Sequence, residues 1–181
     1  MKVIILAAGQ GTRLRPLTDH CPKCMVEVNG KSIIERQLDT MHTCGIEDKD
    51  ITIIAGSRPD VLKEKFKDTE IQFVVNESYE TTNMVCSLMC ARKLMEKESD
   101  ILISYGDIIY SKEVLEKILQ SQDDMGVIVD DGWYEYWSAR CENPLDDAET
   151  LMFDENDYLT EIGQVADRIL VIEDGQVVDF R

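Results

Sequence analysis

Val3-Ile-Ile-Leu-Ala-Ala-Gly-Gln-Gly-Thr-Arg-Leu14 follows directly after the first two residues of the chain. Its apolar, partly β-branched first half predicts a strand buried on both faces of a parallel sheet. The two glycines that follow let the backbone turn and expose amide groups, so the loop can bind a polyphosphate. The loop is not a full dinucleotide fingerprint, because Leu14 stands at the third glycine position. Nor is it a Walker A motif, because Met25 stands where Gly30-Lys31-Ser32 requires an upstream glycine.

Strands and helices alternate after this stretch. Further short apolar runs predict strands at residues 51–55, 71–75, 101–105 and 127–129. Helices are expected after a capping box formed by Ser32 and Glu35, ending at Gly45, and over residues 57–66, 82–97 and 111–120. The order predicts an α/β fold, a doubly wound (Rossmann-like), mostly parallel sheet with helices on both faces and ligands beyond the carboxyl ends of its strands.

The end of the chain has a different pattern, typical of β-hairpins. Strands are expected at residues 150–153 and 158–162, and again at 169–173 and 176–180. The second pair flanks Asp174-Gly175, a dipeptide that suits a type I′ turn. We therefore expect two C-terminal hairpins within a single domain over residues 1–181.

Composition limits the classes of function. The 181 residues include 19 Lys and Arg against 36 Asp and Glu, a formal net charge of −17, and so acidic a surface argues against nucleic-acid binding. No apolar run approaches the roughly 18 residues of a membrane span. The apolar start ends at Gly9 before a polar, basic segment, which argues against a signal peptide. A cytoplasmic protein without a membrane partner, with six reduced cysteines, is expected.

The first 31 residues have the opposite charge. They hold five basic and two acidic side chains, a local charge of +3 in an acidic chain. A basic glycine loop predicts a specific anionic ligand; chance clustering in a surface loop is the alternative.

Two longer motifs carry a family resemblance. Leu6-Ala-Ala-Gly-Gln-Gly-Thr-Arg-Leu-Arg-Pro-Leu-Thr18 with Pro22-Lys23-Cys24-Met25 resembles the signature of the nucleotidyltransferases that make nucleoside-diphosphate sugars and related conjugates. Within that family the chain most resembles the cytidylyltransferases for phosphocholine and 2-aminoethylphosphonate. The segments that carry this closer resemblance are Val26-Glu-Val-Asn-Gly-Lys31 with Glu35-Arg-Gln37, Thr82-Asn-Met-Val85 with Ser87-Leu88, Tyr105-Gly-Asp107, and Asn143-Pro-Leu-Asp-Asp-Ala-Glu149. The resemblance covers about residues 1–163.

The resemblance implies a reaction and a set of site residues. It implies Mg²⁺-dependent transfer of CMP from CTP to phosphocholine or 2-aminoethylphosphonate, with release of pyrophosphate. Arg13 and Lys23 would act as cations on the triphosphate, and Asp107 would be the Mg²⁺ ligand; these three are the expected catalytic residues. The expected nucleotide-binding residues are Leu6, Ala7, Ala8, Gly9, Gly11, Thr12, Arg13, Lys23, Asn83 and Ser87.

Three of these residues also have structural interpretations. An Asp after a strand, such as Asp107, is often a turn or helix cap. Asn83 and Ser87 lie one helical turn apart and could face the nucleobase together, or could be an N-terminal cap and a buried serine.

The segment Trp133-Tyr-Glu-Tyr-Trp137 concentrates aromatic residues. On a helix, Trp133 and Trp137 share a face and could bind the ammonium of an amine substrate through cation–π attraction, assisted by the neighbouring acids Asp130, Asp131 and Glu135. The alternative is that these rings cover one edge of the sheet. Acids at 146, 147 and 149 could also meet an amine, or be solvated surface residues.

The cysteines and the end of the chain leave further alternatives. Cys21 and Cys24 with Cys86 and Cys90 could supply four thiolates to Zn²⁺. The alternative is that Cys21 and Cys24 simply flank Lys23 within the family motif, and that Cys86 and Cys90 extend the apolar face of a helix. After Gly163, family members usually continue with a Lys-Pro pair and later a second metal-binding acid, whereas residues 164–181 form a divergent tail. A nucleotide-binding relative without turnover, completion by a second copy in a homo-oligomer, a sugar-1-phosphate nucleotidylyltransferase and a dinucleotide-dependent dehydrogenase stay as alternatives.

Overall fold

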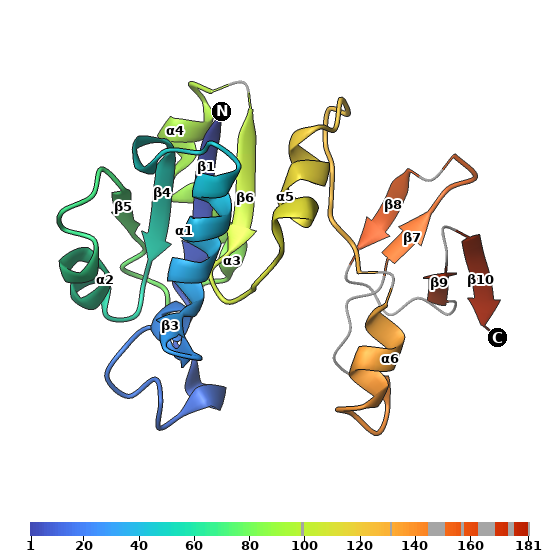
Figure 1. Ribbon diagram of the computed structural model, residues 1–181, viewed down its shortest axis with the longest axis horizontal. Helices are drawn as coiled ribbons and strands as arrows, with labels where there is room; N and C mark the ends of the chain where they lie inside the picture. Colours follow the sequence, from blue (N-terminus) through green and yellow to red (C-terminus); the bar gives the residue numbers. More distant parts are fainter. Residues whose placement is uncertain are drawn as a thin grey trace. The chain divides into compact units, whose positions relative to one another are not determined.

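The computed structural model describes residues 1–98, 100–130, 132–144, 151–156, 158–162, 169–173 and 176–180. The chain folds into two compact units, Met1–Asp124 and Met125–Arg181 (Figure 1). That the whole chain is a single domain stays a prediction.

The first unit is built on a four-stranded parallel sheet with the order β5-β4-β1-β6. Its strands are β1 (Lys2–Ala7), β4 (Ile51–Ala55), β5 (Gln72–Val75) and β6 (Ile101–Tyr105). The predicted α/β, doubly wound fold is confirmed. From β1 the chain first builds the sheet toward β5 and then returns to add β6 on the other side, so the strand order reverses between β1 and β6. Open α/β sheets bind their ligands at such a switch point, beyond the carboxyl ends of the strands.

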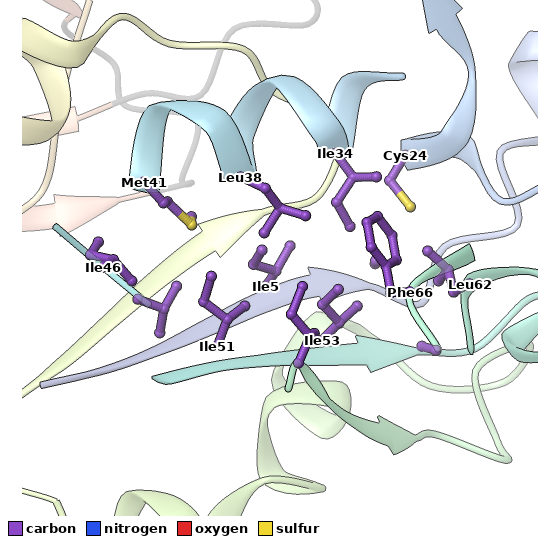
Figure 2. Packing of buried hydrophobic residues seen from close by; sticks show 14 of the residues in the cluster. Ile5, Cys24, Ile34, Leu38, Met41, Ile46, Ile51, Ile53, Leu62 and Phe66 are labelled. Carbon is purple, nitrogen blue, oxygen red and sulfur yellow. The ribbon is translucent and has the colours of Figure 1, made fainter. Parts of the chain in front are cut away.

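Helices cover both faces of this sheet. On one face, α1 (Ile33–Thr43), α2 (Pro59–Lys65) and α5 (Lys112–Leu119) contribute to the larger core, where Ile34, Leu38 and Met41 of α1 pack near Ile5 and Ile53 of the strands (Figure 2). On the other face, α3 (Met84–Met89) and α4 (Arg92–Met95) pack near Ile4 and Ile54. Alternate β1 residues therefore enter opposite cores, which accounts for the continuous apolar run of this strand.

Short elements complete the first unit. They are the 3-10 helices η1 (Thr12–Leu14), η2 (Lys23–Met25) and η3 (Asp48–Asp50) and the antiparallel strands β2 (Glu27–Val28) and β3 (Lys31–Ser32). Asn29 and Gly30 join the two strands with positive φ angles of 50° and 74°, as a two-residue hairpin turn requires.

The expected capping box is present at the start of α1. The Ser32 side chain accepts from the backbone N–H of Glu35, and the Glu35 carboxylate accepts from the backbone N–H of Ser32. A hydrogen bond from Lys65, whose Nζ lies 2.7 Å from Oε1, and one from the Ser32 hydroxyl lower the pKa of Glu35 from 4.5 to about 2. The ionised carboxylate therefore stabilises the folded state.

We expect Glu35→Gln to destabilise the protein by up to about 1 kcal/mol at pH 7, because the charge pairing with Lys65 is lost while the amide oxygen still caps the helix. The folded-state pKa is the lower one, so this contribution is present above pH 4.5 and disappears as the pH falls toward 2. Urea unfolding of both proteins between pH 7 and pH 2 measures it. A stability difference that stays constant across this range would contradict the assignment.

Two secondary-structure predictions are wrong. Residues 82–97 form α3 and α4 rather than one helix, and Ala91 between them is buried against the core of Ile4 and Ile54. Tertiary packing of Ala91 thus outweighs helix continuity. Residues 127–129 form no strand, and their side chains are all exposed. A β-branched run becomes a strand only where a neighbouring strand supplies ladder hydrogen bonds.

The second unit contains α6 (Trp133–Ser138) and two antiparallel strand pairs. Strand β7 (Leu151–Phe153) pairs with β8 (Leu159–Ile162), and β9 (Ile169–Glu173) pairs with β10 (Gln176–Phe180), as predicted. The turn dipeptide at 174–175, the acids at 131, 146, 147 and 149, and residues 163–168, where the family resemblance stops, lie outside the described residues. In the part of the chain that is described, no helix is both long and apolar enough to cross a bilayer.

Candidate active site

A cavity of about 200 Å³ lies in the first unit, at the carboxyl ends of β1 and β6. This is the switch point at which the topology predicts a ligand. The residues that line it are Leu6, Ala7, Ala8, Gly9, Lys23, Cys24, Tyr79, Thr82, Asn83, Met84, Ser87, Tyr105, Gly106 and Asp107.

The glycine loop forms one wall of this cavity. A methyl group added at Gly9 would meet no other atom within 4 Å, so the backbone here borders open space. Gly11 has a φ of 67°, its carbonyl accepts from the Thr18 hydroxyl at 2.8 Å, and an added Cβ would lie 3.1 Å from the Cβ of Lys23. The loop is therefore folded against the segment that carries Lys23.

Lys23 and Asp107 form an ion pair between their Nζ and Oδ2 atoms. Lys23 begins η2, and Asp107 follows β6 after Gly106, so the fold joins residues 84 positions apart. Their side chains are 33% and 37% exposed, which leaves both accessible from the cavity. The pair brings a cation for phosphate and a carboxylate for a hard metal ion to the same point.

Gly106 allows β1 and β6 to approach closely at this point. Its N–H donates to the carbonyl of Leu6 at 2.8 Å, and an added Cβ would lie 3.0 Å from both that oxygen and the Cβ of Ala7. A larger residue would push Asp107 away from the loop.

Asn83 and Ser87 both line the cavity and both have structural roles. Asn83 is the N-cap of α3, with Oδ1 accepting from the N–H of Cys86 at 3.1 Å. Ser87 is buried, donates to the Asn83 carbonyl at 3.3 Å and accepts from the Asn76 amide at 2.9 Å. The structural interpretation is thus observed, while the predicted contact with a nucleobase stays a prediction.

The structure brings most of the predicted nucleotide-binding residues together. Residues 6–9, Lys23, Asn83, Ser87 and Asp107 line the cavity, whereas Gly11, Thr12 and Arg13 do not. Arg13 lies exposed on η1, immediately after the glycine loop. Its predicted contact with a triphosphate stays a prediction.

Tyr79 and Tyr105 are lining residues that the sequence did not single out as binding residues. Tyr105 ends β6, and its hydroxyl donates to the sulfur of Met84 at 2.9 Å. Tyr79 packs against Gly56, where an added Cβ would come within 2.7 Å of the Tyr79 Cβ. The position of Tyr105 next to Gly106-Asp107 could have identified it as a lining residue from the sequence. No local sequence feature identifies Tyr79 as one.

Cys24 also lines the cavity, and burial raises the pKa of its thiol to about 12. A thiol with this pKa is neutral at pH 7 in the metal-free protein. Within the described residues no group of three or more His, Cys, Asp and Glu side chains is placed to hold a metal ion. The alternative of a four-cysteine zinc site therefore has no geometric support there.

Trp133 and Trp137 lie in the second unit, on α6 as expected. The Trp133 ring meets Tyr134 edge-on at 5.6 Å, and the guanidinium of Arg140 lies 5.3 Å from the centre of the Trp137 ring. Trp137 thus already makes a cation–π contact with Arg140, which lies two residues beyond the end of α6.

Comparison with known proteins identifies the family. Residues 3–161 match the model of the MobA-like NTP transferase domain. The chain belongs to this family. The chain is therefore a nucleotidyltransferase, and the alternative of a dinucleotide-dependent dehydrogenase is excluded.

Two curated relatives are cytidylyltransferases. The chain is 40% identical over 178 residues to the CTP:phosphoglutamine cytidylyltransferase of Campylobacter jejuni, an alignment that covers 96% of this chain and 69% of that protein. It is 44% identical over 96 residues to the choline-phosphate cytidylyltransferase of Streptococcus pneumoniae, covering 51% of this chain and 40% of that protein. The chain therefore spans about two thirds of the first relative and less than half of the second.

Two solved structures resemble the fold. The CTP:phosphocholine cytidylyltransferase of Streptococcus pneumoniae aligns with a TM-score of 0.52 and 32% identity, covering 62% of this chain and 49% of that one. The inositol-1-phosphate CTP transferase of T. maritima aligns with a TM-score of 0.67, covering 93% of this chain and 65% of that one, and at 20% identity it supports the fold alone.

The donor set suits one kind of metal ion. Asp107 is the carboxylate among the described residues that line the cavity, beside the cation Lys23. One carboxylate does not make an all-protein metal cage. It does fit Mg²⁺, which typically takes one or two carboxylates and completes its shell with water and substrate phosphates.

Proposed function

We propose that this nucleotidyltransferase transfers CMP from CTP to a phosphate or phosphonate oxygen of a small nitrogen-containing molecule and releases pyrophosphate. The observation that carries the proposal is the cavity that unites the glycine loop, Lys23 and Asp107 at the switch point of the sheet. The names of the relatives add support, because both curated cytidylyltransferases act on a phosphorylated compound of this kind.

The reaction needs alignment and charge neutralisation rather than a covalent nucleophile. An acceptor oxygen attacks the α-phosphorus, and the bond to the leaving pyrophosphate breaks. The amides around Gly9 would bind the phosphates, and Lys23 would exchange its partner Asp107 for a phosphate oxygen. Arg13 would approach the triphosphate from η1, where a guanidinium can bind two oxygens at once.

Asp107 would hold Mg²⁺ together with the phosphates of the nucleotide. The bound ion would supply neutralisation of the charge that develops on the phosphate oxygens. In the free protein Lys23 compensates the Asp107 carboxylate, so metal and nucleotide together would separate the pair.

The nucleobase would lie against α3. The cap of this helix uses Oδ1 of Asn83, so its side-chain NH2 is the group that would donate to the cytosine carbonyl. Tyr79 and Tyr105 offer aromatic surface in the same cavity. Ser87 holds Asn83 through its backbone carbonyl.

Three acceptors fit the proposal. Phosphocholine and 2-aminoethylphosphonate follow from the sequence resemblance, and phosphoglutamine follows from the relative that aligns with 96% of the chain. All three contain a phosphorus group and a nitrogen-containing organic group. Glucose 1-phosphate contains the phosphate but no nitrogen.

Pyrophosphate release tests the proposal directly. The purified chain is assayed with Mg²⁺, each nucleoside triphosphate in turn, and phosphoglutamine, phosphocholine, 2-aminoethylphosphonate or glucose 1-phosphate. Release with CTP and one nitrogen-containing acceptor is the expected result. Release with glucose 1-phosphate alone would replace the proposal by a sugar nucleotidylyltransferase. CTP binding without release from any pair would favour a binding module without turnover.

We expect the double substitution Trp133→Leu and Trp137→Leu to raise the KM for the amine acceptor by about tenfold, because each cation–π contact is worth roughly 0.5–1 kcal/mol. The KM for CTP should change less than twofold. Steady-state kinetics with each substrate varied in turn measures both values. The matched double substitution to Phe keeps two aromatic faces and should retain most of the affinity; equal effects on acceptor and CTP would exclude an aromatic amine site.

A further inference from the structure

Gln37 is a polar residue in the middle of an apolar face. It lies on α1 between Ile34 and Leu38, which point into the larger core, and it is 1% exposed. A primary amide without water must find protein partners, since an unsatisfied buried donor costs several kcal/mol. The partners of Gln37 therefore show what this residue does.

All of these partners belong to one short segment. Nε2 of Gln37 donates to the carbonyls of Tyr105 at 2.7 Å and Ile108 at 2.6 Å, and Oε1 accepts from the Ser104 hydroxyl at 3.3 Å. Tyr105 and Ile108 stand on either side of Gly106-Asp107. One side chain thus spans the turn that carries the candidate metal-binding carboxylate.

The sheet does not hold this turn by itself. Strand β6 ends at Tyr105, and the N–H of Gly106 makes a last bond to the Leu6 carbonyl. Beyond that point the Gln37 amide supplies the hydrogen bond that the carbonyl of Ile108 accepts. The backbone of residues 105–108 sets the position from which the Asp107 side chain projects, and the ion pair with Lys23 then holds the carboxylate.

We propose that Gln37 is a positioning residue for Asp107: its two N–H groups fix the backbone on both sides of the carboxylate and so set where the carboxylate meets a metal ion. The inference rests on the proposed function, in which Asp107 holds Mg²⁺. Groups that orient a ligand residue without touching the metal commonly change metal affinity by 10- to 100-fold. The link also couples α1 in the core to the cavity.

The test compares CTP affinity with Mg²⁺ and with EDTA by calorimetry. Gln37→Met keeps the length and apolar contacts of the side chain but removes both donors. We expect it to reduce the gain in CTP affinity that Mg²⁺ produces by about tenfold, while the affinity in EDTA changes less than twofold. A purely structural role would shift both affinities together or neither, and either result would overturn the inference.

Thr40→Val is the matched control. Thr40 lies one turn further along α1, and its hydroxyl lies 3.1 Å from the carbonyl of Arg36 in the same helix and 3.4 Å from the carbonyl of Tyr110, beyond the Asp107 turn. This variant should leave the Mg²⁺ effect unchanged. Asp107→Asn separates the two claims. If it leaves the Mg²⁺ effect intact, the metal role in the proposed function fails; if it abolishes the effect and Gln37→Met does not, only the inference about Gln37 fails.

A measurement on the unaltered protein covers the case in which Gln37→Met does not fold. The side-chain NH2 of Gln37 gives its own pair of NMR signals, protected from exchange by burial. Adding CTP with Mg²⁺ should shift these signals, whereas CTP in EDTA should leave them in place. Identical spectra under the two conditions would overturn the inference.

Discussion

Asp107→Asn should lower pyrophosphate release from CTP by about 10³-fold. The amide oxygen is a weaker ligand without charge, and losing several kcal/mol of transition-state stabilisation corresponds to a factor of this size. Asp107 is the carboxylate among the described residues of the cavity, so the loss has no evident substitute there. Pyrophosphate release at saturating CTP and Mg²⁺ measures the effect.

The fold should survive this substitution. Asp107 is 37% exposed, and its ion pair with Lys23 is of the partly exposed kind that contributes about 0–1 kcal/mol. The melting temperature should therefore stay within a few degrees of the parent protein. Asp68→Asn is the control, because Asp68 is exposed and does not line the cavity. Unchanged turnover of Asp107→Asn would reject this residue as the metal ligand.

Gly56→Ala should destabilise the first unit by roughly 1–3 kcal/mol and weaken CTP binding by about tenfold. The added Cβ would lie 2.5 Å from the carbonyl oxygen of Ala8 and 2.7 Å from the Cβ of Tyr79. Both neighbours line the cavity, and an overlap with backbone has no flexible side chain to relieve it. The glycine loop and Tyr79 must move apart. Thermal unfolding and calorimetry with CTP measure the two effects.

Gly9→Ala is the matched comparison, because the same methyl group there meets no atom within 4 Å. Its stability should equal that of the parent protein, while CTP binding should weaken, since the methyl occupies the space in front of the loop amides. Equal stability of Gly56→Ala and the parent would show that Ala8 and Tyr79 can move away from residue 56 at little cost. If Gly9→Ala binds CTP as tightly as the parent protein, the glycine loop does not bind the phosphates.

Local sequence was enough for most of the fold. The run from Val3 to Ala7 is apolar on both faces, which requires a central strand, and the capping box at Ser32 fixes where α1 begins. The hairpin turn at Asn29-Gly30 was not predicted, although this dipeptide favours the positive φ angles observed there. Two predictions failed because packing against distant residues determines the local structure. The expected helix over 82–97 is interrupted at Ala91, which is buried in the core, and residues 127–129 form no strand.

The sequence by itself determined the family motif, the alternation of strands and helices, and the identity of the charged residues Lys23 and Asp107. Only the tertiary structure brought these two residues into contact across 84 positions of the sequence. It also packed Tyr79 against Gly56 and directed the Gln37 side chain to the carbonyl of Tyr105 beside Asp107. Periodicity and capping act between residues a few positions apart. A hydrogen bond from a helix to the end of a strand depends on how distant segments pack, which no local pattern records.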